Sequence, residues 1–225
     1  MTRFRLADTD ATLDIAIDEL IIAGWAGREQ ASIQAHIEEL QALGVSPPSQ
    51  TPLFYRVSGD LLTSNSRIQV LGEGSSGEVE ALLVGTPDGT FVGVSSDHTD
   101  REAEAWSVAY SKQCCAKPAA ALLWRLDDVI HHWDELQLES HATIGGERHL
   151  YQHGSIAELL HPKDLLASYG INGSDLRPGQ AMLCGTLPVH GGVRPASRFD
   201  MALIDPVRGR RIDHGYEVQT LPVVS

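Results

Sequence analysis

Three acidic residues stand at the ends of two neighbouring apolar runs. Glu78 and Glu80 are separated by one residue in "GEVEALLVG" (77–85), and Asp97 follows "TFVGVS" (90–95). Residues i and i+2 of a strand project from one face, so Glu78 and Glu80 lie side by side if the first run is a strand. Carboxylates gathered on one patch repel unless a cation neutralises them, and three with room for waters suit Mg²⁺ or Mn²⁺, with Ca²⁺ as an alternative. The spacing therefore predicts a hard-cation site.

The turn between the two runs decides whether Asp97 reaches the pair of glutamates. A two-residue Asp-Gly turn at residues 88–89 places Glu80 opposite Asp97. The same register places Glu78 opposite Thr99. Facing residues share one side of a sheet, so this register brings the three carboxylates together. A bulge or a longer turn would send Asp97 to the other face and leave an ordinary solvated hairpin.

The rest of the chain predicts an α+β fold with a mixed or mostly antiparallel sheet system. Residues 28–44 have apolar residues at helical spacing and Gly44 placed to end the helix. Short β-like runs are expected at 53–57, 67–72, 79–85, 90–95 and, from "WSVAYSKQ", 106–113. The region from Leu122 to Leu138 is expected to be helical, and residues 176–221 return to a β-rich pattern. Within the expected helix from Leu122 to Leu138, "HHWDEL" (131–136) is interpreted as a helix surface with Trp133 packed inward, because adjacent histidines on a helix diverge.

Composition limits the partners of the chain. Its 225 residues, with 42% hydrophobic and 21% charged positions, suit a single domain over residues 1–225. A formal net charge of −13 would repel nucleic acid and acidic membrane surfaces. No apolar run approaches the roughly 20 residues that span a bilayer, and the acidic N-terminus does not resemble a secretory signal. We therefore expect a cytoplasmic location, and the three cysteines predict neither a disulfide framework nor a structural zinc site.

Taken in order, the motifs resemble those of the fumarylacetoacetate hydrolase superfamily. "EVE" (78–80), "SDHTDRE" (96–102), Lys112 and "RPGQAMLCGTLP" (177–188) are similar to its Glu-x-Glu pair, its NDxSxRD motif, its lysine and its PGDxIxTGTP motif. Upstream, "HIEE" (36–39) resembles the His-x-x-Glu lid motif, and "PLFYRV" (52–57) resembles P-x-x-F-x-K-P. The resemblance extends from residue 24 to residue 205. No single motif is specific, but five in order are hard to attribute to chance.

The sequence also departs from the family pattern. Ser96 replaces the usual Asn, Gln180 replaces the Asp of PGD, and Arg56 stands where Lys is common. Arg28 lies further from His36 than the family spacing has it. These differences indicate a divergent bacterial branch.

The resemblance implies a fold, a reaction and a set of site residues. The fold would be a mixed β-sheet roll or sandwich with peripheral helices, in which residues 1–50 form a helical N-terminal region that contributes a candidate lid. Mg²⁺ or Mn²⁺ would be held by Glu78, Glu80 and Asp97, the catalytic residues would be His36, Glu39 and Lys112, and the substrate contacts would be Arg28, Tyr55, Arg56, Arg101, Gly185 and Thr186. Members of this family usually form homodimers.

His36 and Glu39 are neighbours on the surface of the expected helix, where a Glu can orient a His as a general base. The helix alone fits equally well a partly exposed pair without a catalytic role. Lys112 would hold a substrate carboxylate or stabilise an enolate, although an exposed lysine is the common case for this residue type.

The function that the resemblance implies is a metal-dependent reaction on a small 2-oxo acid or dicarbonyl compound through an enolate-like intermediate. C–C bond hydrolysis of an acylpyruvate-type substrate is the leading case. Hydration or dehydration, isomerisation and decarboxylation use the same enolate, and residue spacing does not separate them. A non-catalytic binding protein with a structural metal is the alternative from another class.

Overall fold

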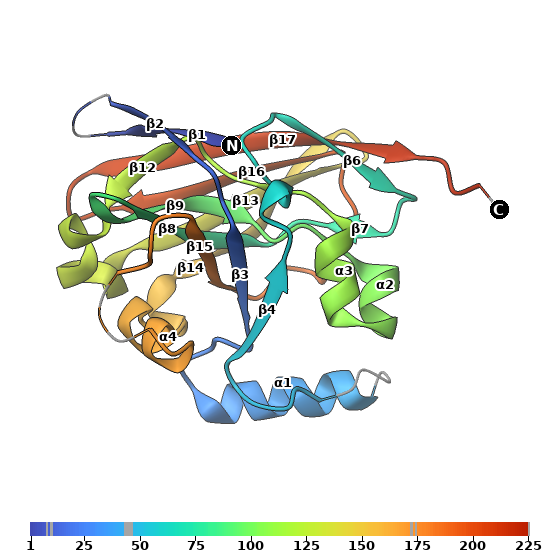
Figure 1. Ribbon diagram of the computed structural model, residues 1–225. Coiled ribbons are helices and arrows are strands. Elements are labelled where there is room, and N and C mark those ends of the chain that lie inside the picture. Colours follow the sequence, from blue (N-terminus) through green and yellow to red (C-terminus); the bar gives the residue numbers. More distant parts are fainter. Residues whose placement is uncertain (8, 10, 43–46, 172, 174, 225) are drawn as a thin grey trace.

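Two mixed β-sheets and the apolar core between them form most of the molecule (Figure 1). The computed structural model describes residues 1–7, 9, 11–42, 47–171, 173 and 175–224. The larger sheet has the strand order β2 (Thr12–Ile15), β1 (Thr2–Leu6), β12 (Leu122–Arg125), β9 (Gly89–Ser96), β8 (Val79–Thr86), β15 (Gln180–Thr186), β3 (Glu19–Gly24) and β4 (Leu53–Val57). The smaller has the order β14 (Glu147–Ser155), β13 (Gln137–Ile144), β16 (Arg198–Asp205), β17 (Arg210–Leu221) and β6 (Arg67–Leu71).

Short elements surround the two sheets. Two small strand pairs are β10 (Thr99–Asp100) with β7 (Ser75–Ser76), and β11 (Lys117–Pro118) with β5 (Leu62–Thr63). The α-helices are α1 (Gln30–Ala42), α2 (Arg101–Trp106), α3 (Val108–Cys114) and α4 (Pro162–Ser168). The 3₁₀ turns are η1 (Gly59–Leu61), η2 (Leu126–Asp128), η3 (Ile130–Glu135) and η4 (Ile156–Glu158). None of the helices in the described part of the chain has the length and apolar character that a bilayer crossing requires.

The larger sheet is covered on both faces, so every residue of β8 is buried. One face packs against the smaller sheet through a cluster that includes Leu83, Phe199 and Tyr216. The other face curls around a second cluster that includes Leu82 and Phe91. Continuous burial explains why the β8 sequence lacks the polar alternation of a half-exposed strand. The predicted α+β class with mixed sheets and peripheral helices is confirmed.

The β8–β9 hairpin has a different register from the predicted one. Thr86 pairs with Gly89, so the turn residues are Pro87 and Asp88. Proline fits the first turn position, and the Thr86 side chain closes the turn by accepting a hydrogen bond from the Asp88 amide at 3.0 Å and donating to the Gly89 carbonyl at 2.9 Å. The pairing therefore shifts by two residues. Because side chains alternate with period two, a shift of two keeps every side chain on its predicted face.

Glu80 consequently lies opposite Ser95 rather than Asp97. Asp97 lies beside Glu78, whose carbonyl accepts the Asp97 amide at 2.9 Å. The predicted cross-strand partners of Glu78 and Glu80 are therefore wrong, but the three carboxylates share one face of the sheet as predicted.

Three other secondary-structure predictions are wrong. Residues 106–113 hold the end of α2, which the Asp100 side chain caps by accepting the amides of Glu102 and Ala103, both at 3.0 Å, and most of α3, in which the Ser111 amide donates to the Ser107 carbonyl at 3.0 Å. Residues 122–138 form β12, η2 and η3 instead of a helix, because the first four residues pair with β9 and β1 within the larger sheet. Among the described residues of the N-terminal region, only α1 is helical, since the apolar runs before it form β1 to β3.

The predicted helix from residue 28 is found as α1, which lies at the periphery of the molecule in Figure 1. Its predicted end at Gly44 lies outside the described residues. The predicted strands at 53–57, 67–72, 79–85 and 90–95 are confirmed as β4, β6, β8 and β9.

Candidate metal centre

The carboxylates of Glu78, Glu80 and Asp97 converge at one end of the β8–β9 hairpin. One oxygen atom from each lies within 4.8 Å of the others. Glu80 and Asp97 are buried and Glu78 is partly buried. Among the residues that the structure describes, these form the only group of three or more His, Cys, Asp and Glu side chains close enough to share a metal ion.

The inner face of the curled sheet positions this group. Glu78 and Glu80 continue the row of side chains that begins with Leu82 and Val84, two members of the inner apolar cluster. The row therefore changes from apolar to acidic where β8 begins. The carboxylates lie at the end of an apolar surface, where burial makes their charges costly unless they are compensated.

Glu80 is held by the backbone of β15. The Gly185 amide donates a hydrogen bond to Glu80 Oε2 at 2.7 Å. Gly185 has a φ of 96°, and a Cβ atom there would lie 2.9 Å from the Cβ of Ala26, so both backbone conformation and space require glycine. Burial and the nearby charge of Asp97 raise the pKa of Glu80 well above its ordinary value. Within the described chain, no Lys, Arg or His side chain forms an ion pair with Glu80.

Asp97 lies between two lysines. Lys112 Nζ, from α3, donates a hydrogen bond to Asp97 Oδ2. Lys117 Nζ, from β11, lies 3.0 Å from Asp97 Oδ1. Burial alone would raise the pKa of Asp97, but the two lysines hold it below its usual range. Burial works against the charge of Lys112 as well, yet Asp97 and Glu78 keep the pKa of Lys112 above its ordinary value.

Arg101 orients Glu78 from the first turn of α2. Its Nη2 atom lies 2.9 Å from Glu78 Oε1, and its Nε donates to Ser76 Oγ at 2.7 Å. Its Nη1 donates to Glu104 Oε2 at 2.8 Å. The arginine is therefore fixed between β7 and α2, with its outer edge facing the carboxylates.

These contacts correct the electrostatic argument drawn from spacing. Lys112, Lys117 and Arg101 already compensate much of the acidic charge, so a divalent cation is not the only means by which the carboxylates can lie together. Lys117 gave no signal in the sequence, because a single lysine in "CCAKP" is typical of an exposed surface.

The residues nevertheless fit a hard divalent cation. The converging atoms are carboxylate oxygens, the ligand type that Mg²⁺ and Mn²⁺ prefer. Among the described residues, Glu80 has the Gly185 amide as its hydrogen-bond partner and no ion pair, and its burial beside the charge of Asp97 raises its pKa. Asp97 Oδ1 is near a lysine but receives no aligned hydrogen bond, so it keeps lone pairs that a metal could use.

A buried polar network supports the ligands from the opposite face of β9. His98 Nδ1 lies 3.0 Å from the Tyr216 hydroxyl, which lies 2.8 Å from Ser96 Oγ. Ser96 Oγ in turn accepts the Glu78 amide at 3.1 Å. Burial lowers the pKa of His98 to about 3, so this ring is neutral near pH 7. Sequence reasoning missed the network because His98 and Tyr216 are far apart in the chain.

Gly185 and Thr186 have a supporting role in the structure. The Gly185 amide binds Glu80, and Thr186 Oγ1 donates to the Val79 carbonyl at 2.8 Å. Gln152 completes this support by accepting the Val79 amide at 2.9 Å and donating to Thr186 Oγ1 at 2.8 Å. The Gly185 amide and the Thr186 hydroxyl, which were expected to contact the substrate, donate hydrogen bonds within the protein, and their substrate contact stays a prediction.

Of the expected substrate contacts, Tyr55 and Arg101 lie at the cluster. Lys112 Nζ is 5.6 Å from the centre of the Tyr55 ring. The next residue on β4, Arg56, projects to the opposite face and lies 3.0 Å from Glu19 Oε1. Arg28 forms a bidentate pair with Asp134 and donates to the Leu159 carbonyl at 3.1 Å. Arg28 and Arg56 thus pair with residues outside the carboxylate cluster, and their substrate contacts stay a prediction.

The backbones of His36 and Glu39 lie in α1, three residues apart as predicted. Their side chains lie outside the described part of the structure, so their general-base role stays a prediction.

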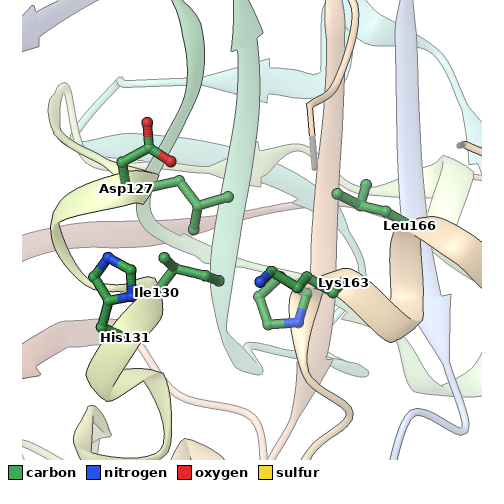
Figure 2. Close-up of a pocket in the computed structure, with 7 residues that line it drawn as sticks. Asp127, Ile130, His131, Lys163 and Leu166 are labelled. Atoms are coloured by element: carbon green, nitrogen blue, oxygen red, sulfur yellow. The ribbon is translucent and has the colours of Figure 1, made fainter. Parts of the chain in front are cut away.

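The histidines of "HHWDEL" do not join the carboxylates. His132 Nε2 lies 3.0 Å from Asp205 Oδ1, and Trp133 is buried, in agreement with the inward packing predicted for it. His131 lines a separate cavity of about 190 Å³ between η2, η3 and α4. Figure 2 shows Asp127, Ile130 and His131 on one side of this cavity and Lys163 and Leu166 on the other. None of the residues that line it belongs to the carboxylate cluster.

Known structures share this fold. A protein assigned as a fumarylpyruvate hydrolase from Burkholderia cenocepacia superposes with a TM-score of 0.66 at 14% identity, over 92% of its own chain and 98% of this one. A fumarylacetoacetate hydrolase family protein from yeast gives 0.60 at 18% identity, over 94% and 92% of the two chains. The 5-carboxymethyl-2-hydroxymuconate delta-isomerase of Mycobacterium smegmatis gives 0.61 at 16% identity, over 84% and 95%. The predicted fold of the fumarylacetoacetate hydrolase type is confirmed.

No curated protein sequence matches the chain. Residues 23–216 match the model of a family described as "Protein of unknown function (DUF2848)". The matched residues include the three carboxylates, both lysines and Arg101. The chain belongs to this family, and it has the fold of the fumarylacetoacetate hydrolases.

Proposed function

We propose that the protein is a metal-dependent enzyme that cleaves a C–C bond in a small acylpyruvate-type 2-oxo acid by hydrolysis. The observation that carries the proposal is the cluster of Glu78, Glu80 and Asp97 with Lys112 directly beside it. A carboxylate triad next to a buried cation suits a substrate that carries a carboxylate and an adjacent carbonyl. The fold supports the same reaction class, because relatives of this fold include proteins assigned to 2-oxo acid chemistry.

The three carboxylates would hold one Mg²⁺ or Mn²⁺, with Ca²⁺ as an alternative. When bound, the ion supplies Lewis-acid polarisation of the 2-oxo group and the substrate carboxylate. The network of Ser96, Tyr216 and His98 holds the ligand backbone in place, as outer-shell contacts do in metal sites.

Lys112 supplies a positive charge for the oxygen that becomes negative during the reaction. Its side chain is almost fully buried, so this charge acts in a medium of low polarity. The aromatic ring of Tyr55 restricts the space around the ammonium group. Arg101, fixed by Ser76 and Glu104, keeps Glu78 from turning away from the site.

Hydrolysis would begin with the activation of a water molecule. A water molecule loses a proton to a base, for which His36 assisted by Glu39 is the candidate, and its oxygen bonds to the distal acyl carbon. The C–C bond then breaks and its electron pair passes to the 2-oxo fragment as an enolate. The enolate takes up a proton, so the products are a carboxylic acid and a 2-oxo acid.

Isomerisation is the second candidate, because one relative of the fold is a delta-isomerase. It would use the same enolate without adding water. Dehydration and decarboxylation would also pass through this enolate, and each gives a different product.

The test is a substrate screen of the purified protein saturated with Mg²⁺ or Mn²⁺. Acylpyruvates, oxaloacetate and 2-oxo-3-deoxy sugar acids are followed by loss of enol absorbance, and products are identified by mass spectrometry in ¹⁸O-labelled water. Hydrolysis is expected to place one ¹⁸O atom in the new carboxyl group of the acid product, whereas isomerisation labels no carboxyl group; label in the exchangeable 2-oxo group is disregarded. Failure of the metal-loaded protein to turn over any member of these classes would contradict the proposal.

A further inference from the structure

Trp25 has a backbone conformation that residues other than glycine rarely adopt. It lies between β3 and the segment that leads into α1, and its φ is 57°. Among the residues that the structure describes, it is the only one other than glycine with a positive φ. A bulky residue in the left-handed region is strained, and such strain is found preferentially where the surrounding structure imposes it, as at functional sites.

The backbone on both sides of Trp25 is fixed. The preceding residue, Gly24, ends β3 within the larger sheet. The carbonyl of the following residue, Ala26, accepts the Leu160 amide at 2.8 Å. The chain therefore turns out of the sheet at Trp25, and a glycine there would take the same φ without strain.

The Trp25 side chain reaches the proposed site through Tyr55. An indole can only donate, so the hydrogen bond between the two side chains runs from the Trp25 N–H to the Tyr55 hydroxyl. The Tyr55 ring lies over Gly24, where an added Cβ atom would come within 2.8 Å of it. The centre of this ring is 5.6 Å from Lys112 Nζ. The partly buried indole thus continues the aromatic surface that begins beside the lysine.

The residues next to Trp25 also border the carboxylates. Tyr55 packs against the inner apolar cluster, whose row of side chains on β8 ends in Glu80. Ala26 lies against Gly185, where an added Cβ atom would come within 2.9 Å of the Ala26 side chain. The Gly185 amide in turn binds Glu80. Trp25 therefore lies at the edge of the space between β4 and the acidic end of β8.

An acylpyruvate has a polar end and an acyl end, and the site offers a different surface to each. In the proposed reaction, the charged groups take the oxygens of the carboxylate and of the 2-oxo group. The acyl group extends away from them and needs an uncharged surface. The rings of Trp25 and Tyr55 supply a rigid surface of this kind beside Lys112.

We propose that Trp25 is a specificity-determining residue, whose indole closes the acyl end of the site and restricts the substrate to acylpyruvates with a short acyl group. This inference rests on the proposed function. It explains the strained backbone, because a glycine would make the turn more easily but would leave this end of the site open.

The test compares kcat/KM for acetylpyruvate and hexanoylpyruvate in the metal-loaded protein. The wild type is expected to prefer acetylpyruvate. In Trp25→Ala and Trp25→Gly, the ratio of hexanoylpyruvate to acetylpyruvate is expected to rise at least about tenfold, since a single methylene can change kcat/KM by about 10- to 200-fold. Trp25→Phe keeps most of the bulk and should stay close to the wild-type ratio. A ratio is independent of the fraction of protein that is active.

Trp106→Ala is the matched control, because it removes a tryptophan that is 74% exposed on α2. It should leave the ratio unchanged. Trp25→Gly should melt at a higher temperature than Trp25→Ala, because glycine takes a φ of 57° without a penalty from Cβ. The glycine variant therefore serves as the test if the alanine variant does not fold.

The outcomes separate this inference from the proposed function. A wild type that turns over both substrates equally well overturns the role of Trp25 alone. An equal loss of kcat/KM on both substrates in the alanine and glycine variants does the same, because it indicates a purely structural residue. Failure of the wild type to turn over any acylpyruvate overturns the proposed function and, with it, the role of Trp25.

Discussion

A Glu80→Gln variant is expected to lose the response to metal and to become more stable without it. Glutamine keeps the shape of Glu80 and can still accept the Gly185 amide, but it removes a buried charge that has no cationic partner among the described residues. Metal affinity should fall by more than about 100-fold, since even outer-shell changes cost 10- to 100-fold. The metal-free protein at neutral pH should gain on the order of 1 kcal/mol in the free energy of unfolding.

The measurement is thermal unfolding with and without Mg²⁺ or Mn²⁺, combined with the turnover assay. Glu147→Gln makes the same chemical change at an exposed site and should respond to metal as the wild type does. A Glu80→Gln protein that is still stabilised by metal and still active would show that Glu80 is not a ligand.

Lys112→Met is expected to reduce turnover by at least about 100-fold while metal binding is retained. Lys112 is the cation nearest to the carboxylates on the side of Tyr55, where the proposed substrate would lie. Stability should fall by about 1–3 kcal/mol, less than for complete loss of a buried ion pair, because Lys117 still neutralises Asp97.

Lys112→Met should lose kcat with Mn²⁺ binding intact. Lys163→Met, at the exposed lysine of α4, is the control for loss of a positive charge. If Lys112→Met keeps its kcat, the lysine is a structural partner of Asp97 and the proposed catalytic role is wrong.

The convergence of the carboxylates could be predicted because it survives any error in the strand register that is an even number of residues. The turn lies at Pro87-Asp88 rather than at Asp88-Gly89, which moves the pairing by two residues and leaves the faces unchanged. A shift of one residue would have separated Asp97 from the glutamates. Sequence alternation therefore predicts which side chains share a face more reliably than which lie opposite each other.

The compensating charges could not be predicted in the same way. Lys117 lies 20 residues beyond Asp97 and reaches it only because β11 packs beside β5 and β9. The roles of Gln152 and Gly185 likewise depend on strands that meet only in the folded protein. Local patterns also favoured a strand at residues 106–113, where the Asp100 cap and the break at Ser107 produce two short helices instead.

The location of Mn²⁺ in crystals of the wild-type protein soaked with the ion tests the metal site most directly. We predict a single strong anomalous difference peak bound by carboxylate oxygens of Glu78, Glu80 and Asp97, with Lys112 still beside Asp97. Anomalous density elsewhere, or none at all while the three carboxylates keep only their contacts with Lys112, Lys117 and Arg101, would contradict it.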